Sequence, residues 1–353
     1  MGTRPNDILP IEVDGRMMVD ADTQSAMPGE FGTALLPGRL LRAAGPAKVA
    51  SGRPVQIDDA RLASVLRPST PLLVLHEGAI HLEGPAWQAS HARLIFSDVP
   101  NRRLLSWNED GRVETAIEGA WFMNGNAIAP DGTVFHCEHG RRCVSRSRPD
   151  LAEAPEPIVT HFDGRRLNAP NDVAVAADGA VWFTDPIFGI AMPGQGALAE
   201  PELDHRSVYR FDPRDGSLAR MADFEQPNGL AFTPDGRTLY VSDTSLSLGE
   251  VPGGVAGEKH EIQAFDVAEG GALSGRRLFC HADHGVPDGF VVDRRGWVWT
   301  SAADGIHVWS SARERLGFIP VPAVVTNLTL GGLESRRLFA TASECLFALD
   351  LVV

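Results

Sequence analysis

A short two-strand unit recurs six times along the 353-residue chain, and this repetition limits the possible fold more than any other feature. In the clearest copy, apolar residues flank the Asp178-Gly179 dipeptide, which is typical of hairpin turns. Each copy opens on a polar residue, and an apolar strand position follows about ten residues later. The six opening residues are Glu83, Asn124, Asn171, Asn228, Asp288 and Asn327.

Successive copies lie roughly 40 to 60 residues apart, which is the range of propeller blades rather than of helical solenoids. The chain also contains 36 Gly and 25 Pro residues, enough to supply many short turns. The sequence therefore predicts an all-β fold, a six-bladed β-propeller over residues 57–353. The sixth blade ends at 345–350 and lacks a fourth strand, and we expect residues 71–76 to supply it. That pairing closes the ring and removes an exposed sheet edge.

Residues 1–56 show no blade pattern and are interpreted as an N-terminal extension. An arm, a lid, a dimer contact and partial disorder are all compatible with their composition. From residue 57 to 66, acidic residues precede spaced apolar ones, which predicts one or two helical turns. The sequence leaves both a monomer and a homodimer open.

The formal net charge of -14 argues against binding to nucleic acid or to an anionic membrane. No apolar run reaches the length of a membrane span, and no basic segment precedes an apolar core at the N-terminus. We therefore expect a cytoplasmic protein. Its four scattered cysteines fit buried small side chains better than a zinc site or a disulfide framework.

The six opening residues should converge, because the innermost strand of every blade lines the central channel of a propeller. All six carry a side-chain carbonyl or carboxylate oxygen. Any one of them alone is better explained as a turn residue. Six in register favour a divalent cation, since calcium and magnesium prefer oxygen ligands. Such a cation can polarise an ester carbonyl while a neighbouring carboxylate, Glu83 or Asp288, removes a proton.

Further polar residues follow the second strands of the blades. His139 and Asp185 are candidates for the site, whereas Asp98 and Glu138 fit strand-end hydrogen bonds better. Long segments at 186–206 and 243–260 should overhang the same face as the opening residues and shape a substrate mouth. They hold few large apolar residues, which favours a polyhydroxylated substrate. No nucleophile elbow, P-loop or dinucleotide fingerprint is present.

Several of these motifs together resemble the gluconolactonase/senescence-marker-protein (regucalcin) family, most closely its bacterial sugar-lactonase branch. The resemblance covers about residues 57–353 and implies a six-bladed propeller with one divalent cation in the axial channel. In the animal branch an Arg precedes the third-blade Asn by two residues and contacts substrate, but here that position is Ala169. The motifs are Glu83-Gly-Pro, Cys137-Glu-His-Gly140, Leu167-Asn-Ala-Pro-Asn-Asp172, Trp182-Phe-Thr-Asp-Pro186, Pro227-Asn-Gly-Leu230, Pro287-Asp-Gly289 and Ser301-Ala-Ala-Asp-Gly305.

The resemblance implies that Glu83, Asn171, Asn228 and Asp288 bind the cation, and that Asp288 is also the general base. We therefore predict a hydrolase that opens a small lactone, most simply a glucono-type sugar lactone, with Asp288 and Glu83 as catalytic residues. Calcium is favoured, and zinc, manganese, magnesium and iron are alternatives. The residues predicted to hold the substrate or its waters are Asn124, His139, Asp185 and Asn327.

Three other functions remain open from sequence. Related propellers cleave phosphorus esters at a similar site, and the unfamiliar extension leaves room for a biosynthetic reaction on an unusual substrate. A non-catalytic binding scaffold is the alternative outside the enzymes, and it predicts an exposed apolar patch on one face.

Overall fold

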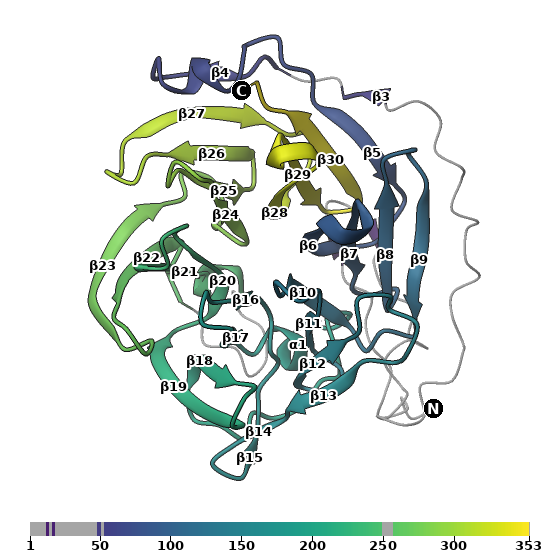
Figure 1. Ribbon diagram of the computed structural model, residues 1–353, viewed down its shortest axis with the longest axis vertical. Coiled ribbons are helices and arrows are strands. Elements are labelled where there is room, and N and C mark those ends of the chain that lie inside the picture. Colours follow the sequence, from purple (N-terminus) through teal and green to yellow (C-terminus); the bar gives the residue numbers. More distant parts are fainter. Residues whose placement is uncertain (1–11, 14–15, 18–47, 51–52, 249–256, 353) are drawn as a thin grey trace, which may run out of the picture.

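The computed structural model describes residues 12–13, 16–17, 48–50, 53–248 and 257–352. Within these ranges, six antiparallel sheets surround a central axis, which confirms the predicted six-bladed β-propeller (Figure 1). The inner strands of neighbouring blades contact one another around the ring. In blades one to four, the sheet order follows the chain outward from the axis.

The first four blades each contain four strands. Blade one consists of β6 (Leu82–Gln88), β7 (Arg93–Asp98), β8 (Arg103–Asn108) and β9 (Val113–Glu118). Blade two consists of β10 (Met123–Ile128), β11 (Val134–Glu138), β12 (Cys143–Ser147) and β13 (Glu156–Val159). Blade three consists of β16 (Val173–Val175), β17 (Val181–Asp185), β18 (Arg206–Asp212) and β19 (Ser217–Phe224). Blade four consists of β20 (Pro227–Phe232), β21 (Thr238–Asp243), β22 (Glu261–Val267) and β23 (Leu273–His281).

Blades five and six each gain a fifth strand from the N-terminal part of the chain (Figure 1). Blade five consists of β24 (Phe290–Val292), β25 (Val298–Ala302), β26 (Gly305–Trp309), β27 (Arg315–Pro320) and β4 (Gln56–Ile57). Blade six consists of β28 (Val325–Gly331), β29 (Arg337–Ala342), β30 (Cys345–Asp350), β5 (Leu73–Glu77) and β3 (Lys48–Val49). The antiparallel pairing of β5 with β30 confirms the predicted closure of the ring.

The segment between β4 and β5 braces this closure. Between β4 and β5, the short 3-10 helix η2 (Leu62–Ser64) confirms the expected helical turn, and Leu62, Val65 and Leu66 are fully buried in the core of blades five and six. Burying three such side chains stabilises the fold by several kcal/mol, at about 1.5–3 kcal/mol each. The remaining short elements are β1 (Glu12–Val13), β2 (Arg16–Met17), β14 (His161–Phe162), β15 (Arg165–Arg166), α1 (Phe188–Ala191), η3 (Ala89–His91), η4 (Ser245–Leu248) and η5 (Leu333–Ser335).

The hairpins between first and second strands form through local hydrogen bonds. At the turn joining β16 to β17, Gly179 has φ +84°, a conformation that glycine adopts without steric cost. The Asp178 carboxylate accepts a hydrogen bond from the Ala180 amide at 3.0 Å, and the Gly179 amide donates to the Ala176 carbonyl at 2.9 Å. This is the Asx-turn chemistry that the Asp-Gly dipeptide predicts.

Each opening residue lies at a break in its sheet ladder. Four inner strands change register around it, and β16 and β24 begin only after Asn171 and Asp288. A bulge of this kind interrupts the regular strand geometry and changes the direction in which a side chain points. The breaks therefore let six polar side chains gather beside the axis without interrupting the outer strands.

The long segments after β17 and β21 begin beside the opening residues, as predicted. Asp185 is paired with Ser207 across β17 and β18, and the Asn171 amide bonds the Thr184 carbonyl at 2.9 Å. The first segment contains α1, whose large apolar side chains are packed inward against Ala169. The predicted mouth segment 243–260 is described only in part, because 249–256 lie outside the described residues. None of the helices in the described ranges is long and apolar enough to cross a membrane.

Candidate metal centre on the propeller axis

The six opening residues are brought together on the axis, as the repeat predicts. Five of them are buried, and Asp288 is half-buried. They come from the axial ends of β6, β10, β20 and β28 and from the residues just before β16 and β24 (Figure 1). Polar side chains buried in this way are costly unless a partner satisfies them.

Three carboxylates face one another at this point. Burial, followed by the negative charges of Glu83 and Asp172, raises the pKa of Asp288 well above its usual range. Burial is also the main cause that raises the pKa of Asp172 to about 7, and the charge of Glu83 adds to it. Like charges held in a dry site favour the protonated form, and a divalent cation relieves the same repulsion.

The amide of Asn171 has a defined orientation. Nδ1 of His139 lies 2.7 Å from the carbonyl oxygen of Gln195, and a carbonyl only accepts, so Nδ1 carries the proton. Nε2 of His139 is then an acceptor, and Nδ2 of Asn171 donates to it at 3.4 Å. This arrangement leaves Oδ1 of Asn171 as the atom available to a ligand. His139 is buried in its neutral form, because burial lowers its pKa to about 4.

The amide of Asn228 is also oriented by a hydrogen bond from its nitrogen. Its Nδ2 donates to Oγ1 of Thr244 at 3.2 Å, and a hydrogen bond from the Asn228 side chain favours the ionised form of Asp288. Donation uses the nitrogen of the amide, so Oδ1 of Asn228 is left to accept or to coordinate. Blades three and four therefore each present one amide oxygen.

The other two opening amides differ from these. In Asn327, Oδ1 accepts the Leu328 amide at 2.8 Å, and Nδ2 lies 3.5 Å from Oε2 of Glu83. Its oxygen is thus used within its own strand. For the Asn124 side chain, the structure gives no hydrogen bond to another described residue, although the backbone oxygen of Asn124 accepts from Ser97 at 2.8 Å. Asn124 is buried, but among the four opening amides its side chain is the one left with both its oxygen and its nitrogen available to a substrate hydroxyl.

Asp185, predicted to contact substrate, is fully buried behind the axial residues. Its two carboxylate oxygens accept the backbone amides of Asn168 and Ala169, both at 2.9 Å. In blade four, Asp243 accepts the amides of Glu225 and Gln226 in the same way, at 3.0 and 2.9 Å. This placement favours a positioning role, in which each aspartate fixes the backbone that leads into an opening residue.

Two residues beside the site were not singled out from sequence. Nε2 of His81, on the segment between β5 and β6, lies 3.7 Å from Oε1 of Glu83. Asp172 follows Asn171, at a place where glycine follows the opening residue in four other blades. That break in the pattern was a usable signal for Asp172. The position of His81 had no comparable signal, because it depends on how the chain enters blade one.

The side chains present fit a hard divalent cation. Across the described ranges, no three histidine, cysteine, aspartate or glutamate side chains are arranged to hold a metal by themselves, so amide oxygens have to complete the site. Two carboxylates, Glu83 and Asp288, and the two oriented amide oxygens, of Asn171 and Asn228, form such a set. All four donors are oxygen, which suits calcium or magnesium better than a soft transition metal.

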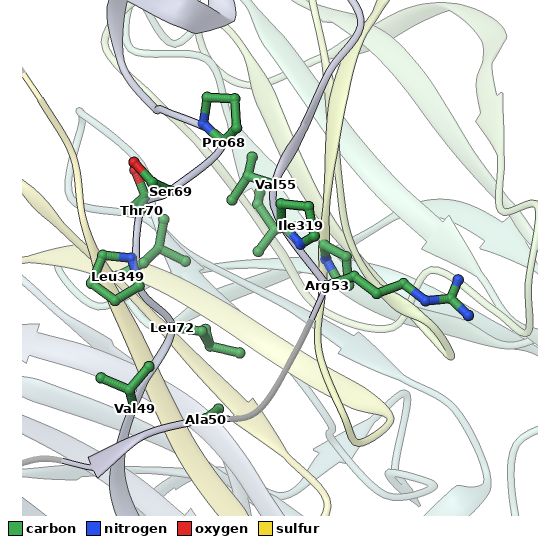
Figure 2. Close-up of a pocket in the computed structure, with 13 residues that line it drawn as sticks. Val49, Ala50, Arg53, Val55, Pro68, Ser69, Thr70, Leu72, Ile319 and Leu349 are labelled. Atoms are coloured by element: carbon green, nitrogen blue, oxygen red, sulfur yellow. The ribbon is translucent and has the colours of Figure 1, made fainter.

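A separate cavity of about 260 Å³ lies away from the axis (Figure 2). It is formed by residues 49–50, 53–55 and 68–72 together with β27 and β30, and Figure 2 shows mainly apolar side chains around it. None of the predicted site residues lines this cavity. It is a feature of the brace between blades five and six.

Comparison with known proteins agrees with this architecture. The family model described as SMP-30/Gluconolactonase/LRE-like region matches residues 82–344. A solved gluconolactonase structure from Xanthomonas campestris is 45% identical, with a TM-score of 0.81, over 88% of this chain and 98% of that one. A gluconolactonase of Zymomonas mobilis is 28% identical over 80% of this chain and 82% of its own length. A pentonolactonase of Haloferax volcanii is 27% identical over 74% of this chain and 81% of its own length.

Proposed function

The chain belongs to the SMP-30/gluconolactonase/LRE-like family, and from this membership we propose that it is a hydrolase that opens a small sugar lactone at a divalent cation on the propeller axis. Its relatives include proteins named gluconolactonase and pentonolactonase, which support a lactone of five or six carbons as the substrate class. Calcium is the cation we favour, because every proposed ligand is an oxygen atom.

The observation that carries this proposal is the orientation of two amides toward two carboxylates. The side-chain nitrogen of Asn171 donates to His139 and that of Asn228 donates to Thr244, so both amide oxygens are left to face the axis. Glu83 and Asp288 face the same point and repel each other. When bound there, the cation supplies positive charge that polarises the lactone carbonyl.

Asp288 is placed to act as the general base. It is half-buried, so water can reach it, and its carboxylate is a group that can take up the proton of an attacking water. Asp288 would accept a proton from the attacking water as the hydroxyl adds to the carbonyl carbon. The ring C–O bond then breaks, and the leaving ring oxygen takes up that proton to become a hydroxyl group. We assign Asn124, in blade two on the opposite side of the axis from blade five, to hold a substrate hydroxyl.

The walls of the site favour an uncharged, hydroxylated substrate. Ala169, at the position that carries Arg in the animal branch, is buried under α1 together with Phe188 and Ile190. His139, which lies behind Asn171, is buried in its neutral form, so it adds no cationic group for recognition. We infer that recognition relies on hydrogen bonds to hydroxyl groups and not on a guanidinium clamp.

A lactone panel followed by pH indicator tests the proposal. Protein stripped with a chelator should hydrolyse neither gluconolactone nor pentonolactones above the uncatalysed rate, and added calcium should restore turnover. Magnesium, manganese and zinc, supplied in parallel, identify the preferred ion. Full activity in stripped protein that contains no divalent cation by elemental analysis would exclude the cation mechanism. No turnover of any lactone by cation-loaded protein would exclude the lactonase.

A further inference from the structure

One side-chain amide lies between two carboxylates on the axis. Nδ2 of Asn327 is 3.5 Å from Oε2 of Glu83, and the Asn327 side chain also faces the Asp172 carboxylate. Because Oδ1 of Asn327 already accepts the Leu328 amide, the NH2 group is left to face the carboxylates. Its two hydrogens can serve both, so Asn327 of blade six links Glu83 of blade one to Asp172 of blade three.

The Asp172 carboxylate is itself fixed by backbone amides. Oδ1 accepts from Val173 at 2.9 Å, and Oδ2 accepts from Leu230 of blade four at 3.3 Å. Thr184 holds the peptide groups on both sides of Asp172. The Asp172 amide donates to Oγ1 of Thr184 at 3.0 Å, and the Thr184 amide donates to the Asp172 carbonyl oxygen at 3.0 Å. With its oxygens taken by N–H donors, this carboxylate is arranged to hold other groups rather than to coordinate an ion.

Two glycines leave space for the side chains of Asn327 and Asp172. A Cβ at Gly289 of blade five would lie 2.0 Å from Cγ of Asn327, and a Cβ at Gly125 of blade two would lie 2.6 Å from Oδ1 of Asp172. Contacts this short do not occur for real side chains, so each glycine is needed where it stands. All six blades therefore contribute to the position of two polar side chains.

We propose that Asp172 and Asn327 are positioning residues, which together hold the Glu83 carboxylate on the axis without contacting substrate or cation. The amide hydrogens of Asn327 separate two carboxylates that would otherwise repel each other across the channel. This inference rests on the proposed function, in which Glu83 is a ligand of the cation. It also explains why Asn327 differs from Asn171 and Asn228 in the direction of its amide.

A double-mutant cycle in the full chain tests the pair. Asp172→Asn replaces one carboxylate oxygen by an NH2 group, which faces an N–H donor that the carboxylate oxygen accepts in the wild type. Asn327→Leu keeps a similar side-chain volume but removes the two amide hydrogens that Asn327 donates. Asp293→Asn is the matched control, because Asp293 is as deeply buried and accepts the amides of Arg295 and Trp297 at 2.8 and 2.9 Å, but lies in the hairpin after β24. Each protein is titrated with calcium in a calorimeter without substrate, and each is unfolded in urea with chelator present.

Asp172→Asn and Asn327→Leu should each weaken calcium binding about tenfold or more, and the double variant should be no weaker than the poorer single variant. Asp293→Asn should lower the urea midpoint but leave calcium affinity within about twofold. Unchanged calcium affinity in either single variant, additive losses, or an equal loss in Asp293→Asn would overturn the assignment.

Unfolding without cation separates this inference from the proposed function. If wild-type protein binds no calcium, magnesium, manganese or zinc, the proposed cation mechanism fails. In that case, the proposed contact between Asp172 and Asn327 is still supported if the two substitutions have non-additive effects on the free energy of unfolding, measured in urea without cation. Additive effects in that cycle would contradict the pair, whatever the activity of the enzyme.

Discussion

Nε2 of His139 accepts the side-chain amide of Asn171 at 3.4 Å, while the other ring nitrogen donates to the carbonyl oxygen of Gln195 at 2.7 Å. A histidine that follows the second strand of blade two thus decides which atom of an asparagine in blade three faces the axis. Outer partners of this kind commonly hold the ligands of a metal site in place.

His139→Leu should therefore weaken cation binding. Leucine occupies similar space but offers no acceptor, so the Asn171 amide loses the contact that fixes its orientation. We expect calcium affinity to fall about tenfold or more, in line with outer-partner substitutions at other metal sites. Calorimetric titration of the two proteins measures this directly, and equal affinities would show that the Asn171 orientation does not matter for the cation.

Substitutions of Asp288 should separate binding from chemistry. Asp288→Asn retains a side-chain oxygen of the same reach but cannot take a proton, so kcat should fall by about 100-fold or more while most of the cation affinity remains. Asp288→Ala removes the oxygen as well and should lose both. Steady-state kinetics with a lactone and calorimetry with calcium distinguish the two cases. An Asp288→Asn enzyme with normal kcat would mean that another group is the base.

Acid should destabilise the fold through His136. This histidine is fully buried between Asn126 and Ser147, at 2.7 and 3.0 Å, and burial lowers its pKa to about 3. An unfolded histidine titrates near 6.5, so between pH 6.5 and 3 the unfolded chain binds more protons, and the free energy of unfolding falls as pH decreases. From pH 7 to 5 the loss from this group is about 2 kcal/mol.

Urea unfolding at pH 7, 6 and 5 measures this dependence. His136→Gln should be less stable at pH 7, because its hydrogen bonds are disturbed, but should lose less further stability toward pH 5. The free energy of unfolding of the variant should still depend on pH to some extent, because His139 is also buried with a lowered pKa. Identical slopes in wild type and variant would show that His136 does not carry the acid sensitivity.

Gly289→Ala should displace the Asn327 side chain, because the new Cβ would lie 2.0 Å from its Cγ. We expect weaker calcium binding and a lower kcat together. Gly296→Ala is a useful comparison in the same blade, since Gly296 has φ +77° and a new Cβ there would lie 3.8 Å from Cβ of Ser311. That variant should lose stability from the strained backbone while its calcium affinity stays normal. Equal calcium affinities for all three proteins would contradict the crowding at Gly289.

Much of this architecture could be predicted from sequence, because it follows from local patterns. The Asp178-Gly179 turn and the polar opening residues repeat with the blades, so both the number of blades and the convergence of Glu83 and Asp288 follow from register. The pairing of β5 with β30 follows from the absence of any other partner for the final strand.

Other features depend on contacts between residues far apart in the chain. The pairing of β3 and β4 with blades six and five involves two residues each, too few to give a periodic signal. The different orientations of Asn171 and Asn327 are set by His139 and by the Leu328 backbone amide, and the repeat pattern treats both asparagines alike. Sequence therefore predicted which residues meet on the axis, while their individual roles required the structure.

A crystal structure of the protein grown with calcium tests the central claim most directly. The account predicts one ion on the propeller axis, with oxygen atoms of Glu83, Asn171, Asn228 and Asp288 about 2.3–2.6 Å from it. Nδ2 of Asn327 should face Glu83 and Asp172, outside the coordination shell. An axis without an ion at saturating calcium, or an ion bound elsewhere while these four side chains point apart, would contradict the proposed metal centre.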